Sequence, residues 1–204
     1  MTVAVTQDMG PPLPAAFYDR PVLEVARALV GCVVHHAGAS GVILETEAYH
    51  ADEAACHAHI GRTPRTAVLL GPPGRAYVYR SYGIHALLNA VCEPDGVGAA
   101  VLIRALEPVR GVDGMRARRA FVPDARLCDG PGKLTQALSL GLEAHGTSLV
   151  HGPVTITARA PGWEDVRLIT GVRIGITKAV DLPWRFCAAG RRGVSRPWPP
   201  DLLP

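Results

Sequence analysis

The apolar segments of this sequence come in pairs separated by short turns, and this pairing limits the folds open to the chain. Cys32–His36 and Gly41–Tyr49 form one pair, joined by a turn-rich stretch. Arg75–Ser81 and His85–Glu93 form a second pair, with Gly83 at the turn. Runs of this kind on either side of a short turn predict antiparallel hairpins, whereas parallel strands need a long crossover. The pattern favours an antiparallel sheet over a doubly wound parallel one.

Helical patterns lie between these groups of strands. One helix is predicted to begin at Asp19, with Pro21 in its first turn and an apolar stripe up to Val30. Further helices are predicted over Asp52–His59, Pro64–Leu70, Val112–Phe121 and Lys133–Leu142. Further strands are predicted over Ala99–Leu106, Val154–Ala158, Val166–Thr177 and Arg185–Ala188. The predicted fold class is therefore α+β.

The length of the chain favours one domain. A chain of 204 residues is long enough to bury one hydrophobic core of ordinary size and too short for two. Residues 1–16 are polar, rich in proline and unpatterned, which predicts a loose N-terminal arm ahead of a domain over residues 17–204. The five cysteines are odd in number and never form a C-x-x-C pair, which argues against a disulfide framework and a zinc ribbon.

The sequence shows neither a secretory signal nor an apolar run near the ~20 residues that span a bilayer. We therefore expect an intracellular protein without membrane contact, either cytoplasmic and nucleoid-associated or nuclear. The formal charge is only +3, but the arginines gather in residues 110–126 and 185–196. Such local patches attract phosphate whatever the net charge is. The alternative is that arginine merely replaces lysine throughout the chain.

The segment Gly41–Tyr49 places two carboxylates on one face of a strand. With a period of two, Glu45, Glu47 and Tyr49 share a face, and Ile43 precedes them on it. Glutamate is disfavoured in strands, so the presence of two glutamates in one strand calls for an explanation. Either the face is solvated, or it supplies a carboxylate base beside an aromatic wall.

A cysteine and two histidines follow in Cys56-His57-Ala58-His59. The cluster suggests a metal, but it lacks the H-x-E and P-C-x-x-C elements of zinc deaminases. We expect no metal and no cofactor. His57 is then either a satisfied core histidine or a hydrogen-bonding wall of a small-molecule pocket.

Three tyrosines lie in the second hairpin. Tyr77 and Tyr79 share a face, which is more often core than binding site, whereas Tyr82 falls beside Gly83 at the turn. An exposed ring at a tip costs apolar area unless something covers it, and nucleic-acid proteins use such wedges to enter the base stack.

The run Gly130-Pro131-Gly132-Lys133 begins a predicted helix that Asp129 is expected to cap. Free backbone N–H groups, the helix dipole and Lys133 together suit a phosphate. Helix starts rich in glycine and proline are also common without any ligand.

Seven short motifs follow one another in a specific order. They are ETEAY at Glu45–Tyr49, His57 within ACHA, GRTPR at Gly61–Arg65, YVYxxYG at Tyr77–Gly83, Asn89, LIRALEP at Leu102–Pro108, and LCDGPGKLTQAL at Leu127–Leu138. Each motif is weak alone, but the series extends from about Pro21 to Ala188 and covers nearly the whole chain. In this order and spacing the chain resembles the mammalian-type 3-methyladenine (alkyladenine, methylpurine) DNA glycosylase family.

The resemblance implies a single domain on a curved antiparallel sheet flanked by helices. It implies a monomeric base excision repair enzyme that acts on damaged double-stranded DNA, flips out an alkylated or deaminated purine, and hydrolyses its N-glycosidic bond to leave an abasic site. It also implies roles for individual residues. These are Glu47 as general base, Arg104 holding the water near it, Tyr49, His57 and Tyr79 lining the base pocket, Asn89 obstructing the guanine 2-amino group, Tyr82 as the intercalating wedge, and Gly132 and Lys133 as phosphate contacts.

The chemistry is coherent with these roles. Cleaving a glycosidic bond builds positive charge on the sugar, which a carboxylate stabilises while it deprotonates the attacking water. Alkylated purines already carry positive charge, and tyrosine rings favour such cationic bases. A glycosylase-lyase would need an amine nucleophile. Only Lys133 and Lys178 are available besides the N-terminus, so we expect a monofunctional hydrolase.

Two other classes of function remain as alternatives. A lesion-binding protein that does not cut would keep Tyr82 and the basic patches without needing Glu47. A carbohydrate hydrolase could use Glu45 and Glu47 at the ~5 Å separation of a retaining enzyme. However, the tryptophans that a sugar platform would need all fall late in the chain.

Overall fold

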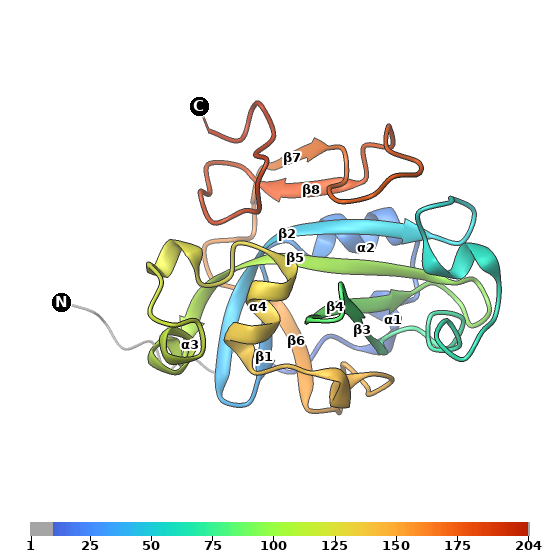
Figure 1. Ribbon diagram of the computed structural model, residues 1–204, viewed down its shortest axis with the longest axis horizontal. Helices are drawn as coiled ribbons and strands as arrows, with labels where there is room; N and C mark the ends of the chain where they lie inside the picture. The colour runs from blue at the N-terminus through green and yellow to red at the C-terminus, as the bar shows by residue number, and fades with distance from the viewer. Residues whose placement is uncertain (1–9, 204) are drawn as a thin grey trace.

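The computed structural model describes residues 10–203 and contains one antiparallel sheet with helices on both faces (Figure 1). The strands are β1 (Cys32–His36), β2 (Ala39–His50), β3 (Ala76–Ser81), β4 (His85–Cys92), β5 (Ala99–Arg110), β6 (Val154–Arg159), β7 (Leu168–Gly171) and β8 (Arg185–Ala188). The helices are α1 (Ala15–Tyr18), α2 (Val22–Leu29), α3 (Val112–Arg118) and α4 (Pro131–Leu138). Short 3-10 turns are η1 (His57–Ile60), η2 (Asp124–Arg126) and η3 (Leu142–Ala144).

Strand β2 is the centre of the sheet. The strand order is β3-β4-β5-β2-β1-β6, and β8 pairs both with β2 and with β7. The predicted hairpins β1–β2 and β3–β4 are both present, and every strand pair is antiparallel. Register shifts between β2 and β5 fall on either side of Glu45, and such bulges bend the strand that carries them. The α+β class with a curved antiparallel sheet is confirmed.

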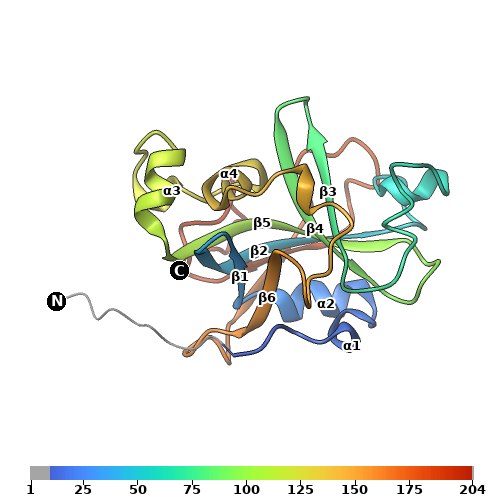
Figure 2. The ribbon, with the colours of Figure 1, turned by 90° about the horizontal axis from the view of Figure 1, so that it is seen from below.

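The two faces of the sheet are covered differently. Helices α1 and α2 lie on one side, whereas the β3–β4 hairpin projects on the other side, where α3 and α4 also lie (Figure 2). Helix α2 packs against β2 and β5, and Thr46 donates its hydroxyl to the Ala26 carbonyl at 2.8 Å. Helix α4 packs against β4 and β5. Strand β2 is consequently buried on both faces from Ala39 to Ala48.

Helix α2 forms because its apolar residues have helical spacing. Val22, Val25, Ala26 and Leu29 are all buried, and positions i, i+3, i+4 and i+7 share one face of a helix. The prediction that Asp19 begins and caps this helix is wrong, because the residue at the N-cap is Pro21. The Glu93 carboxylate instead accepts the Val22 N–H at 2.8 Å, which satisfies one of the free N–H groups of the first turn.

Several predicted elements are shorter than their patterns suggested. Helix α4 ends at Leu138, because Ser139 takes a left-handed conformation with φ of 57°, and Asp129 pairs with Lys133 instead of capping it. The helices predicted over Asp52–His59 and Pro64–Leu70 are wrong. These segments form turns, apart from η1. Of the strand predicted over Val166–Thr177, only β7 forms.

Part of the predicted N-terminal arm pairs with the sheet. Residues 1–9 lie outside the described residues, but the Leu13 N–H donates to the Ile156 carbonyl at 2.8 Å, and Pro12 bridges to Thr157. Among residues 10–203, no helix is long and apolar enough to cross a lipid bilayer.

Candidate active site

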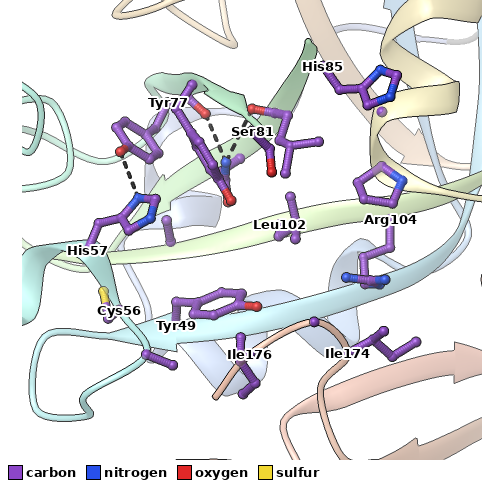
Figure 3. Close-up of a pocket in the computed structure, with 18 of the residues that line it drawn as sticks. Tyr49, Cys56, His57, Tyr77, Ser81, His85, Leu102, Arg104, Ile174 and Ile176 are labelled. Atoms are coloured by element: carbon purple, nitrogen blue, oxygen red, sulfur yellow. Dashed lines mark hydrogen bonds between the residues drawn. The ribbon is translucent and has the colours of Figure 1, made fainter. Parts of the chain in front are cut away.

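A pocket of about 810 Å³ opens between the β3–β4 hairpin, β2, β5, the start of α4 and the irregular segment after β7. Eight of the residues singled out from the sequence line it: Tyr49, His57, Tyr79, Tyr82, Asn89, Arg104, Gly132 and Lys133. In Figure 3, Ile174 and Ile176 reach the pocket from the side opposite Tyr77 and His57. The fold therefore brings together residues that are spread from β2 to α4 in the chain.

Glu47 lies directly behind the wall of this pocket. Its side chain is 0% exposed. One carboxylate oxygen, Oε2, accepts hydrogen bonds from the Tyr49 hydroxyl at 2.8 Å and from Arg104 Nη1 at 3.0 Å. The other oxygen, Oε1, accepts the Ile174 backbone N–H at 2.7 Å. All three donor residues line the pocket, so the carboxylate is one layer of atoms away from it.

The interpretation of Glu45 and Glu47 as a solvated outer face is wrong. Both side chains are 0% exposed, because β2 has neighbours on both edges and is covered on both faces. Burial raises the pKa of the Glu47 carboxyl above its usual range. The Arg104 guanidinium, the Ile174 N–H and the Tyr49 hydroxyl act in the opposite direction. Burial also raises the pKa of Tyr49, so that its hydroxyl stays protonated and donates to Glu47.

Glu45 makes different contacts from those of Glu47. Its Oε1 accepts from Arg104 Nε at 3.0 Å, from Arg185 Nε at 2.6 Å and from the Ser195 hydroxyl at 2.8 Å, while its Oε2 accepts the Ser195 N–H at 2.6 Å. Arg104 thus bridges the two glutamates, with Nε on Glu45 and Nη1 on Glu47. We infer that Glu45 orients Arg104 and connects β2 to β8 and the C-terminal segment.

An aromatic cluster forms another wall. The His57 and Tyr79 rings meet edge to face with centroids 4.7 Å apart, and Tyr77 and Tyr79 lie 5.5 Å apart. The Tyr77 hydroxyl is 2.9 Å from His57 Nδ1 (Figure 3). Arg65 Nη2 lies 3.3 Å from His57 Nε2, and its guanidinium sits over the Tyr79 ring. Burial and Arg65 both lower the pKa of His57, which favours the neutral imidazole.

Asn89 lies on β4 opposite Tyr77 on one neighbouring strand and opposite Leu102 on the other. Its side-chain amide donates to the Tyr77 carbonyl at 3.0 Å and, at the longer distance of 3.4 Å, to the Leu87 carbonyl. The side chain is buried and lines the pocket. The amide is therefore fixed by backbone contacts and also contributes to the pocket surface.

The tip of the β3–β4 hairpin is apolar and exposed. Tyr82 is 89% exposed and has a positive φ of 50°, and Ile84 beside it is 76% exposed. The start of α4 lies close against this hairpin. The approach is so close that a Cβ added at Gly132 would lie 2.7 Å from the His85 side chain. Lys133 Nζ is 2.7 Å from the Asp129 carboxylate, and its side chain remains partly exposed.

Three participants in the site had no assigned role from the sequence. Tyr77 is interpreted from the sequence as a core residue because it shares a strand face with Tyr79. Arg65 belongs to the GRTPR motif, but no role is predicted for it individually. The Ile174 N–H is a backbone group in an irregular segment, and no side-chain pattern could have indicated it.

Comparisons with known proteins identify the family of this chain. A family model described as methylpurine-DNA glycosylase matches residues 16–192. A protein of Bradyrhizobium diazoefficiens is 50% identical over 191 residues, which cover 94% of each chain. A protein of Rhodopseudomonas palustris is 52% identical over 190 residues, 93% of each chain. Both carry the name "Putative 3-methyladenine DNA glycosylase". This chain therefore belongs to the methylpurine-DNA glycosylase family.

Proposed function

We propose that this protein excises alkylated purines, 3-methyladenine among them, from double-stranded DNA by hydrolysing the N-glycosidic bond, with Glu47 as the base that activates water. The observation that carries the proposal is the buried Glu47 carboxylate, held by Arg104, Tyr49 and the Ile174 N–H behind an aromatic pocket. Residues of a single chain supply the whole site, so we propose that the enzyme acts as a monomer.

The hydrogen bonds to Glu47 favour Oε1 as the atom that accepts the proton in this proposal. A carboxylate oxygen has two lone-pair positions. Both positions on Oε2 are used, by Tyr49 and Arg104, whereas Oε1 has a single donor, the Ile174 N–H. The second lone pair of Oε1 is therefore the site that takes a proton from water. The negative charge also stabilises the cationic sugar of the transition state.

The pocket walls select the base. Tyr49 and Tyr79 offer the faces of electron-rich rings to a positively charged purine, and neutral His57 does not repel it. We propose that Asn89 obstructs the 2-amino group of guanine. Hypoxanthine lacks that group, so the same pocket admits a deaminated purine.

The position of Glu47 requires the base to leave the helix. An enzyme that acts on a base cannot reach the glycosidic bond inside a stacked duplex, so the nucleotide has to be flipped out. We propose that the exposed Tyr82 ring fills the gap left in the stack and that Gly132 and Lys133 at the start of α4 bind a neighbouring phosphate. The exposed tip and the start of α4 are next to each other, which suits one stretch of DNA.

Two observations favour this activity over the alternatives. Glu45 is bound by Arg104, Arg185 and Ser195, and of these residues only Arg104 lines the pocket, which disfavours Glu45 as the second acid of a sugar hydrolase. A lesion-binding protein that does not cut has no use for the buried charge of Glu47.

The test is incubation of the protein with a duplex that contains one 3-methyladenine or one hypoxanthine, followed by chromatography of the released base. We expect the free base and an abasic strand, and no covalent enzyme–DNA product on borohydride treatment, because the reaction is a hydrolysis. Tight lesion binding without release would instead support the non-cutting alternative. Release accompanied by borohydride trapping would contradict the monofunctional mechanism.

A further inference from the structure

The chain between β7 and β8 forms one side of the pocket without regular structure. Ile174, Gly175, Ile176, Thr177 and Lys178 line the pocket, and no helix or strand is present between residues 172 and 180. The same segment supplies the Ile174 N–H that binds Oε1 of Glu47 at 2.7 Å. Ordering an irregular segment costs conformational entropy, so other contacts have to hold this N–H in place.

Arg173 provides these contacts. Its Nη1 donates to the Ala48 carbonyl at 2.9 Å, which attaches the segment to β2 between Glu47 and Tyr49. Its Nη2 donates to the Ala179 carbonyl at 3.2 Å, which joins the two ends of the segment. The guanidinium therefore fixes the residue directly before Ile174 to the residue directly after Glu47.

A carboxylate and two aromatic rings hold the guanidinium in turn. Glu53, in the turn after β2, pairs with it in a fork, with distances of 2.6 Å to Nη1 and 3.0 Å to Nη2. The Arg173 side chain lies over the rings of Tyr49 and Trp184, 4.6 Å and 5.3 Å from their centroids. Arg173 thus also packs against Tyr49, whose hydroxyl binds Oε2 of Glu47.

Stability alone is a weak reason for this arrangement. The Arg173 side chain is 0% exposed, and among the described residues its Nε is one of the buried polar atoms without a hydrogen-bond partner. Buried ion pairs can be replaced by apolar residues with little loss, or even a gain, of stability. An arginine that joins two separate donors of Glu47 does something that an apolar residue cannot do.

We infer that Arg173 is a positioning residue, which holds the 172–179 segment and the Tyr49 ring so that the Ile174 N–H and the Tyr49 hydroxyl bind the two oxygens of Glu47. The inference rests on the proposed function of Glu47. Loss of Arg173 should slow the chemical step and leave lesion binding nearly intact, because the wedge at Tyr82 and the start of α4 are on other elements.

The test uses the double variant Arg173→Met/Glu53→Gln. The second change avoids an unpaired buried carboxylate and keeps a side-chain oxygen for the Ala55 N–H that Glu53 binds. We expect single-turnover excision to fall by ~10- to 10²-fold, the scale of a ~1 Å misplacement. The Kd for the lesion duplex should stay within about threefold. Arg173→Lys should restore little of the rate, because an ammonium cannot reproduce the planar fork.

The pH–rate profile separates positioning from a merely structural role. The Ile174 N–H lowers the pKa of Glu47, so its displacement should move the acid limb of the profile to higher pH. The Tyr49 hydroxyl on β2 also lowers the pKa of Glu47, so its displacement acts in the same direction. Arg104 on β5 and Glu45 on β2 do not contact Arg173 through any of the hydrogen bonds described above and are the same in both proteins. Arg159→Met is the matched control. Arg159 bonds to the Val30, Arg27 and Glu164 carbonyls, outside the pocket lining, and should show the parental rate and profile.

A folded double variant with the parental rate and parental pH profile would overturn the inference. So would a loss of activity that the thermal melt explains entirely by unfolding at the assay temperature. If Glu47→Gln excises at the parental rate, the proposed function itself fails. If Glu47→Gln is inactive while Arg173→Met/Glu53→Gln is fully active, only the role of Arg173 fails.

Discussion

Glu45 and Glu47 have the same side chain and the same burial, and their neighbours alone set them apart. Glu45 is bound by Arg104, Arg185 and Ser195, and of these residues only Arg104 lines the pocket. The donors to Glu47 come from Tyr49, Arg104 and Ile174, which all line the pocket. At the scale of the residue, these contacts favour a structural role for Glu45 and support the proposed catalytic role of Glu47.

Glu47→Gln should reduce single-turnover excision of hypoxanthine or 3-methyladenine by at least ~10²–10⁴-fold, because an amide neither accepts the proton nor carries the charge. Affinity for the lesion duplex should hold or rise, since the wedge and pocket remain. Glu45→Gln should reduce excision less and lower the melting temperature, because the amide replaces one acceptor oxygen by an NH2 donor and removes the charge that pairs with Arg104 and Arg185. An inactive Glu45 variant beside a fully active Glu47 variant would reverse the two assignments.

Asn89→Ser should raise the release of undamaged guanine from duplex DNA, because the shorter side chain leaves room for the 2-amino group. The change also removes the amide donors to the Tyr77 and Leu87 carbonyls, at a cost of ~1 kcal/mol in unfolding free energy. Guanine release and the melting temperature are measured on the same preparation. If the folded variant releases no more guanine than the parent, Asn89 does not obstruct the 2-amino group, and its amide only binds the Tyr77 and Leu87 carbonyls.

At the scale of elements, the β3–β4 hairpin combines two tasks along its length. Its base belongs to the sheet and carries Tyr77, Tyr79 and Asn89 into the pocket. Its tip projects from the sheet on the side of α3 and α4 (Figure 2) and exposes Tyr82 and Ile84. One hairpin thus carries both the proposed base pocket and the proposed wedge.

Tyr82→Ala should weaken binding of the lesion duplex by ~1–3 kcal/mol, which is roughly 5- to 150-fold in Kd, because the ring no longer stacks in the gap left by the flipped base. A fluorescent base analogue opposite or beside the lesion reports the flipped state. Ile84→Ala is the matched control at the same exposed tip and should change the affinity less. Unchanged affinity and unchanged flipping in the Tyr82 variant would remove the wedge role.

At the scale of the whole molecule, the site is a meeting point of distant chain segments. Glu47 and the Ile174 N–H are 127 residues apart in the chain, and Glu45 and Ser195 are 150 residues apart. The sheet order places β8 and the segment before it beside β2. The contacts around Glu45 and Glu47 therefore require that distant segments of the chain have packed together.

The raised pKa of Glu47 couples stability to pH. A carboxyl whose pKa is higher in the folded state than in the unfolded chain contributes stability below its unfolded pKa, and this contribution is lost as pH rises through the folded pKa. At neutral pH the ionised Glu47 carboxylate therefore lowers the free energy of unfolding relative to its protonated form. Relative to the parent, the melting temperature of Glu47→Gln should be highest at neutral pH, and the difference should shrink on acidification. A difference that grows on acidification would show that the pKa is lowered instead.

The acid limb of the excision rate should follow the same group. Because Glu47 has to be ionised to accept a proton, single-turnover excision should fall on acidification at a pH above that of an ordinary glutamate. Rates are measured across pH at saturating enzyme. An acid limb at the usual glutamate pKa would argue against burial as the dominant effect on Glu47.

Much of this protein follows from its sequence alone. Alternation and turns predicted the hairpins β1–β2 and β3–β4 and the α+β class, because side-chain period and turn residues are local properties. The order of the motifs indicated the family. It also indicated eight residues that line the pocket, from Tyr49 to Lys133, but not Tyr77, Arg65 or Ile174. The failure at Asp19 has a tertiary cause, because the remote Glu93 carboxylate accepts the Val22 N–H. In Asp52–His59 and Pro64–Leu70, local side-chain contacts such as Glu53 with the Ala55 N–H and Thr66 with the Gly61 carbonyl accompany turns in place of helices.

Only the tertiary structure decided how these residues work. A strand pattern with glutamates on one face is compatible with water on that face. The burial of Glu45 and Glu47 depends on Arg104 of β5, Arg185 of β8 and the segments around Ile174 and Ser195, which enclose the two carboxylates. The donor to Oε1 of Glu47 is the backbone N–H of Ile174. Every residue other than proline carries such a group, so this contact leaves no mark in the sequence. The role of Arg173 likewise appears only when Ala48, Glu53 and Ala179 are brought around its guanidinium. Contacts between segments more than a hundred residues apart are set by packing, and local sequence patterns do not encode them.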